Sequence, residues 1–226
     1  MKIISVSQVQ GHIDWKYVRD ADAAVIRFSY GCDVDCCLGI APETDDLAEA
    51  NLRGANQAKI SCGVSHLLGG TTASDVHKEA AWLISRLNHY KNYITLPIVV
   101  VSLGDHEIAA KYCALSPAQN TNLIKIFCNI IKRAGYTPVL YANREILTEH
   151  IERKKLGSIG IWYDRPFVSE VLAQEEEPDM LFWQYSTETS PRNAGIYADY
   201  PVSKAINYFF RTPAPRFHTT VCGLYA

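Results

Sequence analysis

The sequence lacks several features that would each point to a particular class of protein. It has no excess of positive charge, because its 22 lysine and arginine residues are outnumbered by 24 aspartate and glutamate residues, which gives a net charge of −2. Nucleic acid is therefore not an expected partner. No apolar run reaches the ~18 residues of a membrane span. The amino terminus has no apolar stretch typical of a secretory signal, so we expect a protein that is cytoplasmic at synthesis.

Cysteine is too infrequent for a disulfide framework, and the seven cysteines are an odd number. We therefore expect free thiols. Cys32, Cys36 and Cys37 lie close together, but no second pair of Cys or His residues follows them at the spacing of a zinc site. Buried or loop thiols are the expectation at these three positions.

The composition is that of a globular protein, with 48% hydrophobic and 20% charged residues. Its length of 226 residues fits a single α/β barrel. We expect one barrel domain over residues 1–211 and a carboxy-terminal tail over residues 212–226. The two prolines at 213 and 215 would interrupt any helix at that boundary.

Short apolar segments alternate with longer segments of helical periodicity, which is typical of parallel strands joined by helices. The predicted helices cover residues 45–58, 74–89 with Ser74 as the N-cap, and a segment that begins at Ser116-Pro117 and ends at Gly135. The segment 96–103 is apolar on both faces, which predicts cover on both sides, and the acidic run 174–179 is expected to be a solvated loop. The predicted strands cover residues 3–6, 23–28, 60–65, 96–103, 137–141, 158–162 and 180–184.

In a barrel of this kind, catalytic groups come from the carboxyl ends of the strands. Polar and aromatic residues that follow apolar segments are therefore the candidates. Aromatic rings stack on the apolar faces of sugars, while carboxylates and amides bind sugar hydroxyls, so this composition predicts a glycan cleft. A core position is the alternative for each ring. The aromatic candidates are Trp15, Trp162, Tyr163, Trp183, Tyr185, Tyr197 and Tyr200.

Eight short motifs occur in a particular order along the chain: IISVSQVQGHIDW at 3–15, IRFSYG at 26–31, GVSHL at 63–67, VHKEA at 76–80, GYTPVLY at 135–141, IWY at 161–163, WQYS at 183–186 and IYAD at 196–199. Each motif alone is weak, but this order over roughly residues 1–210 is hard to obtain by chance. Together they resemble glycoside hydrolase family 25, the barrel-fold lysozymes or muramidases of bacteria and phages. The resemblance implies a TIM-like (β/α) barrel of the family 25 lysozyme type, an α/β fold, with no cofactor and no metal.

The departures from the family pattern fall mainly on its acidic residues, although Val9 and Ser65 also replace a tryptophan and a tyrosine of the family motifs. Ser5 stands where the first-strand motif of the family has an aspartate. Counted from Pro97, the family's D-x-E pair corresponds to Val101 and Leu103, whereas Asp199 stays where the family has an acid. A glycosidase needs a proton donor and a second group that stabilises the oxocarbenium-like centre, and hydrocarbon side chains supply neither.

Asp105 and Glu107 have the same spacing as the missing pair. They lie four residues further on, which is about 13 Å along a strand. A longer or shifted strand would bring them to the barrel mouth, and the sequence leaves this register open.

We therefore expect a lysozyme-like protein that recognises peptidoglycan or a related glycan, with weakened or lost hydrolysis. The first alternative is an active N-acetylmuramidase, or endolysin, that uses Asp105, Glu107 and Asp199. The second alternative is an interaction module that binds no glycan. Release to the cell wall by lysis and retention in the cytosol are both open. The expected substrate-binding residues are Trp162, Tyr163, Trp183, Tyr185, His66 and Ser5, and His12, His66 and His106 are expected to form hydrogen bonds rather than bind a metal.

Overall fold

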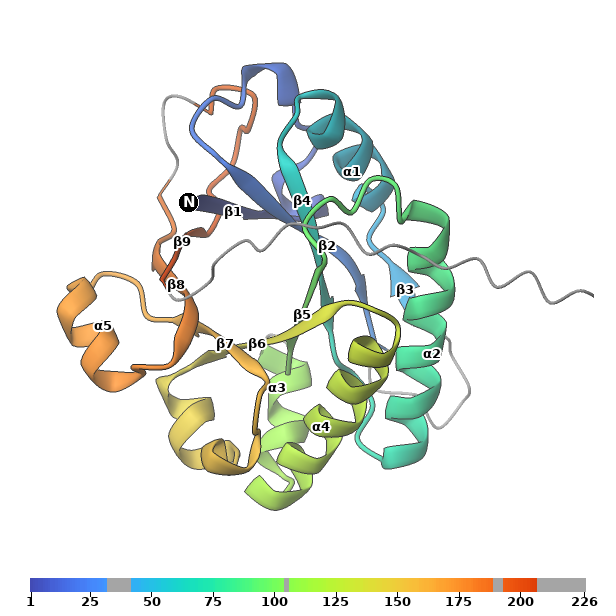
Figure 1. Cartoon of the computed structure of the whole chain (residues 1–226), viewed down its shortest axis with the longest axis vertical. Helices are drawn as coiled ribbons and strands as arrows, with labels where there is room; N and C mark the ends of the chain where they lie inside the picture. The colour runs from blue at the N-terminus through green and yellow to red at the C-terminus, as the bar shows by residue number, and fades with distance from the viewer. Residues whose placement is uncertain (32–41, 104–105, 189–192, 207–226) are drawn as a thin grey trace, which may run out of the picture.

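A closed barrel of eight strands forms the centre of the molecule (Figure 1). The computed structural model describes residues 1–31, 42–103, 106–188 and 193–206, with side chains except at 106–109. Neighbouring strands from β1 to β8 pair in parallel, and β9 closes the ring by pairing antiparallel with β8 and β1. The predicted α/β barrel is confirmed. Its strands are β1 (Lys2–Val6), β2 (Ala23–Tyr30), β4 (Ser61–Leu67), β5 (Ile98–Ser102), β6 (Thr137–Asn143), β7 (Gly160–Asp164), β8 (Met180–Ser186) and β9 (Val202–Ala205).

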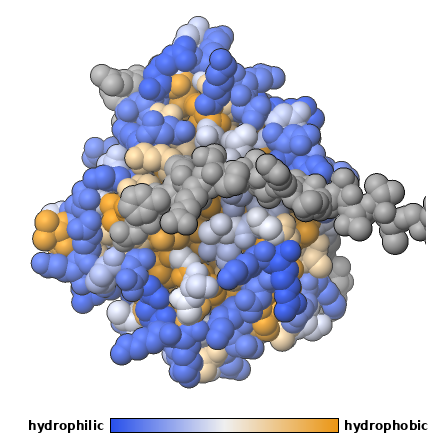
Figure 2. Space-filling view, in the orientation of Figure 1, coloured by the Kyte–Doolittle hydropathy of each residue, from blue (hydrophilic) through white to orange (hydrophobic). Residues whose placement is uncertain are grey.

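Helices of the described ranges pack outside these strands (Figure 1). They are α1 (Ala48–Gln57), α2 (Ala73–Tyr90), α3 (His106–Cys113), α4 (Pro117–Arg133) and α5 (Glu170–Glu176). Shorter elements are η1 (Gln8–Gln10), η2 (Trp15–Tyr17), η5 (Arg153–Lys155), the π-helical η4 (Ile146–His150) and β3 (Glu43–Thr44), which pairs antiparallel with β2. Within the described ranges, no helix is both long and apolar enough to cross a membrane. On the face of the molecule that Figure 1 views, Figure 2 shows apolar residues near the centre and hydrophilic residues around the edge.

The helix boundaries follow from local chemistry. The Ser116 hydroxyl accepts a hydrogen bond from the backbone N–H of Gln119, whose side chain accepts one from the backbone N–H of Ser116, so α4 begins with a capping box. Gly135 follows α4 with φ of 91°, a conformation that glycine adopts without strain. At α2 the N-cap is Thr72 rather than the expected Ser74.

The core has two layers, one inside the barrel and one between the barrel and the helices. Along β5, Ile98 and Val100 belong to the inner layer, whereas Val99 and Val101 belong to the outer one. Burial on both sides explains why this strand shows no alternation of apolar and polar residues. The predicted cover on both faces is therefore confirmed. Ile3, Val25, Val139, Trp162 and Phe182 complete much of the inner layer.

The acidic run 174–179 is not the solvated loop that the sequence suggested, because part of it belongs to α5. The Glu176 carboxylate accepts hydrogen bonds from Arg165 at 2.8 Å and from the Tyr163 hydroxyl at 2.7 Å, and the Arg165 contact is the main cause of its lowered pKa. The buried Glu177 accepts from the Arg153 guanidinium. Cationic partners elsewhere in the chain therefore bind both carboxylates, with Glu176 at the end of α5 and Glu177 directly after it.

Two strands were not predicted, namely β3 and β9, which have two and four residues. The thiols of Cys62, Cys113 and Cys128 are free, as expected, and burial raises the pKa of the Cys62 and Cys128 thiols to about 12. The predicted tail over 212–226 lies outside the described residues, as do Cys32, Cys36 and Cys37.

A buried polar cluster connects β2, β4 and α2. His66 is fully buried, with its Nδ1 2.8 Å from the Ser29 hydroxyl and its Nε2 2.6 Å from a carboxylate oxygen of Glu79. Glu79 also accepts hydrogen bonds from the backbone N–H groups of Gly69 and Gly70 at 2.9 and 2.8 Å. The carboxylate therefore satisfies three donors that water does not reach.

Replacing Glu79 with alanine is expected to lower the free energy of unfolding by about 3–5 kcal/mol, because it leaves His66 and two backbone N–H groups buried without an acceptor. Chemical denaturation measures the effect. The matched control is Glu175→Ala at an exposed position of α5, which should change stability by less than about 0.5 kcal/mol. Equal effects of the two substitutions would contradict the structural role of this cluster.

Candidate functional site

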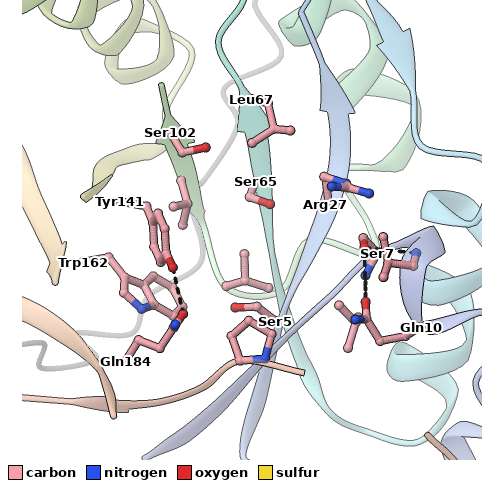
Figure 3. A pocket seen from close by; sticks show the side chains of 15 residues that line it. Ser5, Ser7, Gln10, Arg27, Ser65, Leu67, Ser102, Tyr141, Trp162 and Gln184 are labelled. Carbon is pink, nitrogen blue, oxygen red and sulfur yellow. Dashed lines mark hydrogen bonds between the residues drawn. The ribbon is translucent and has the colours of Figure 1, made fainter. Parts of the chain in front are cut away.

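A pocket of about 270 Å³ lies at the mouth of the barrel, where the carboxyl ends of the parallel strands meet (Figure 3). Most strands contribute inward-facing side chains near these ends, as expected for a barrel of this kind. Its described lining combines one guanidinium group, several hydroxyl and amide groups, and aromatic rings. The lining residues are Ser5, Val6, Ser7, Val9, Gln10, Val25, Arg27, Ser65, Leu67, Val100, Ser102, Tyr141, Trp162, Gln184 and Pro201.

One wall of the pocket is a hydrogen-bonded chain on β6, β7 and β8 (Figure 3). The Tyr141 hydroxyl donates to Gln184 Oε1 at 3.0 Å, and Gln184 Nε2 donates to a carboxylate oxygen of Asp164 at 2.8 Å. Burial raises the pKa of Asp164, although a hydrogen bond from Tyr141 opposes this effect. The Trp162 indole donates to the Ser203 hydroxyl at 2.9 Å, which fixes the ring.

Arg27, Ser7 and Gln10 lie on the opposite side of the pocket in Figure 3. The Gln10 side chain accepts from the backbone N–H of Ser7 at 2.8 Å and donates to the backbone carbonyl of Asp199 at 2.9 Å. Arg27 Nε donates to a carboxylate oxygen of Asp45 at 3.2 Å. These bonds hold the polar side chains of this wall in fixed orientations.

Only one of the three acids expected to catalyse hydrolysis has a described side chain. Asp105 lies outside the described residues, and Glu107 lies in α3 at a position whose side chain is not described. Asp199 is exposed, and its backbone carbonyl bonds to Gln10. No carboxylate is found among the described residues that line the pocket.

The register of β5 shows where the two residues counted from Pro97 lie. Val101 and Leu103 face the outer layer beneath the helices, whereas Val100 and Ser102 line the pocket. The sequence did not reveal this, because hydrocarbon on both faces hides the alternation of the strand. The two positions of β5 that face the pocket therefore carry an isopropyl group and a hydroxyl group.

The six residues expected to bind a glycan divide into two groups. Ser5 and Trp162 line the pocket. Tyr163 and Trp183 directly follow or precede an inward-facing residue, so they belong to the outer layer of the core. Tyr185 packs against this outer layer. His66 belongs to the buried cluster with Ser29 and Glu79 and stacks on Phe127, 5.3 Å between ring centres.

Several residues at the pocket were not among those expected to bind the glycan. They are Gln10, Arg27, Tyr141 and Gln184, with Asp164 behind Gln184. The available signal was the period-two alternation along each strand. Tyr141, Trp162 and Gln184 lie on the inner face of three successive strands, and Tyr141 is directly opposite Trp162 in the register.

One group of potential metal ligands lies together within the described part of the chain. It consists of Glu145, Glu149 and His150, in and beside η4, where both glutamates are exposed. None of them lines the pocket, and His12 and His66 do not belong to the group. The side chain of His106 is not described.

Many solved structures share this fold, and three of them illustrate the similarity. The autolysin LytC of Streptococcus pneumoniae, determined with a synthetic peptidoglycan ligand, is 21% identical with a TM-score of 0.72, over 89% of this chain and 46% of LytC. A lysozyme from Streptomyces coelicolor is 23% identical with a TM-score of 0.69, over 91% of each chain. The catalytic domain of endolysin ply40, from bacteriophage P40 of Listeria monocytogenes, is 16% identical with a TM-score of 0.71, over 91% and 93%. This chain thus spans less than half of LytC.

No curated protein sequence matches the chain significantly. The family model described as "Glycosyl hydrolases family 25" matches residues 4–193, which is most of the chain and extends from within β1 past the end of β8. The barrel, its pocket and this match lead to one conclusion: the chain belongs to glycosyl hydrolase family 25.

Proposed function

We propose that the protein binds peptidoglycan or a related glycan in the pocket at the barrel mouth, and that it hydrolyses this glycan weakly or not at all. Membership of a glycosyl hydrolase family supports the class of ligand. The LytC structure, which contains a synthetic peptidoglycan ligand, supports it further through the shared fold. On this proposal the protein acts at the bacterial cell wall, where peptidoglycan occurs.

The composition of the pocket is the observation that carries the proposal. Tyr141 offers a ring for stacking on a sugar, and Trp162 lines the pocket although only 1% of it is exposed. The amide of Gln184 is held between Tyr141 and Asp164. Hydroxyl groups on β1, β4 and β5 complete the polar surface. Such a surface matches the alternating apolar faces and hydroxyl groups of a sugar ring.

The same composition argues against efficient hydrolysis. A glycosidase protonates the leaving oxygen and stabilises the oxocarbenium-like centre with a second group, and both roles usually belong to carboxylates. The described lining residues include none. Ser5 and Ser102 face the pocket with hydroxyl groups, whose protons are far too weakly acidic for this step.

Hydrolysis is the second candidate function, and Asp164 is the observation that favours it. This residue ends β7, contacts the pocket through Gln184, and has a pKa raised by burial. A raised pKa keeps a larger fraction of the carboxyl protonated at a given pH, as a general acid requires. Asp105, Glu107 and Asp199 are the other acids that this candidate would use.

Replacing Tyr141 with phenylalanine is expected to weaken binding of soluble muropeptide fragments about fivefold, because the Gln184 amide loses its donor and the sugar loses a hydroxyl contact of about 1 kcal/mol. Isothermal titration calorimetry measures the change. The matched control is Tyr197→Phe, since Tyr197 is 78% exposed and does not line the pocket. Failure of the unaltered protein to bind either the fragments or insoluble peptidoglycan would overturn the proposal.

Release of reducing ends from purified cell walls is expected to be at least about 10²-fold slower than with an active family member, because a missing general acid has a cost of this size. The assay covers pH 4 to 8, the range in which carboxylates and histidine titrate. Glu107→Gln and Asp164→Asn should leave the low rate unchanged.

A fast reaction would instead support the second candidate. If Asp164 is the proton donor, the rate should fall as the pH rises through its raised pKa, because the deprotonated form has no proton to donate. Loss of a fast reaction in Asp164→Asn alone identifies that residue, whereas loss in Glu107→Gln alone identifies Glu107.

A further inference from the structure

Arg27 is the one charged residue among the described residues that line the pocket. We propose that its guanidinium group forms an anion subsite, which binds a carboxylate carried by the glycan. This inference rests on the proposed function and names the class of substrate more closely, as a sugar chain with acidic substituents. Two carboxylates of peptidoglycan have this chemistry, the lactyl group of muramic acid and the acidic groups of the stem peptide.

Asp45 fixes the orientation of Arg27. Its side chain is fully buried and accepts hydrogen bonds from the backbone N–H groups of Gln8 and Leu47, at 3.0 to 3.1 Å, as well as from Arg27 Nε at 3.2 Å. The carboxylate therefore has partners besides the guanidinium. Asp45 acts as a positioning residue, because it engages one edge of the guanidinium and leaves the other edge for a ligand.

The terminal nitrogens of Arg27 have no hydrogen-bond partner within the described part of the chain, where its Nε contact with Asp45 is its one such bond. Only 19% of its side chain is exposed to solvent. A guanidinium that is largely shielded from water is stabilised when an anion satisfies its remaining donors. A carboxylate fits this edge of the fork with two parallel hydrogen bonds.

Hydroxyl groups lie next to Arg27 on the neighbouring strands. Ser65 on β4 is directly opposite Arg27 in the β2–β4 register, and Ser5 on β1 is opposite Val25, the preceding inward-facing residue of β2. Both serines line the pocket. Hydroxyl groups donate hydrogen bonds to a carboxylate and do not repel it, whereas acidic side chains at these positions would repel it.

The test compares three soluble ligands of similar length by isothermal titration calorimetry. The first is a neutral chitin oligosaccharide, the second is an N-acetylglucosamine–N-acetylmuramic acid oligosaccharide with free lactyl carboxylates, and the third carries stem peptides on those lactyl groups. We expect at least one acidic ligand to bind about tenfold or more tightly than the neutral one. This preference should shrink at high salt, because added ions screen a partly exposed charge.

Arg27→Met should reduce the ratio of the affinity for the preferred acidic ligand to the affinity for the neutral ligand to near one. Lys154→Met removes a positive charge at an exposed position outside the pocket and should keep the ratio. Arg27→Lys retains the charge without the planar fork and should keep part of the preference, which guards against misfolding of the methionine variant. Preference for the second ligand identifies the lactyl carboxylate, and preference for the third identifies the stem peptide.

The outcomes separate the two proposals. Binding of the neutral and acidic ligands with equal affinity would overturn the anion subsite and leave the glycan-binding function standing. Full retention of the preference by Arg27→Met would likewise overturn the subsite alone. Absence of binding to all three ligands would overturn the glycan-binding function, and the subsite with it.

Discussion

The alternation of side chains along the eight closed strands decides which residues reach the pocket. Ring closure by β9 fixes the register of every strand, so each strand presents one set of residues to the interior and the other set to the helices. On β5 this rule turns Ser102 into the pocket and Val101 away from it. A shift of one residue would exchange the two sets and give a pocket of different chemistry.

This constraint links the fold to the proposed function. Buried apolar side chains, among them Ile3 and Phe182, fill the interior of the barrel. The polar groups of the pocket lie at the mouth above them. There the described lining offers hydroxyl groups, amides, two aromatic rings and a guanidinium. The chain thus has the scaffold of its glycosyl hydrolase family, and the described lining of its mouth contains no carboxylate, which is the basis of the proposed glycan binding with weak or no hydrolysis.

Local signals in the sequence were sufficient for much of the fold. The Ser116 capping box and Gly135 mark both ends of α4 within a few residues, and no distant contact is needed to read them. Non-local features were not accessible in this way. The acidic residue Glu176 belongs to α5 and is paired with Arg165, and the four-residue β9 is defined by its antiparallel neighbours rather than by its own pattern.

The candidate site was predictable only in part for the same reason. Ser5 and Trp162 were expected in the cleft and line the pocket, because both occupy inward-facing positions of their strands. Tyr163, Trp183 and Tyr185 follow equally apolar segments but face outward. Arg27 was quoted within a motif, and its place in the pocket depends on the pairing of β2 with β1 and β4.

The proposed function has two parts, that a glycan binds at the barrel mouth and that it is not cleaved there. Nuclear magnetic resonance tests both parts in one experiment. Of the four tryptophans, only Trp162 lines the pocket. Titration of isotope-labelled protein with a muropeptide oligosaccharide should shift the indole N–H signal of Trp162 and leave the signal of Trp82 unchanged. After prolonged incubation, the spectrum of the sugar should still be that of the intact oligosaccharide. An unshifted Trp162 signal at saturating ligand would contradict binding in the pocket, and rapid appearance of new reducing ends would contradict the loss of hydrolysis.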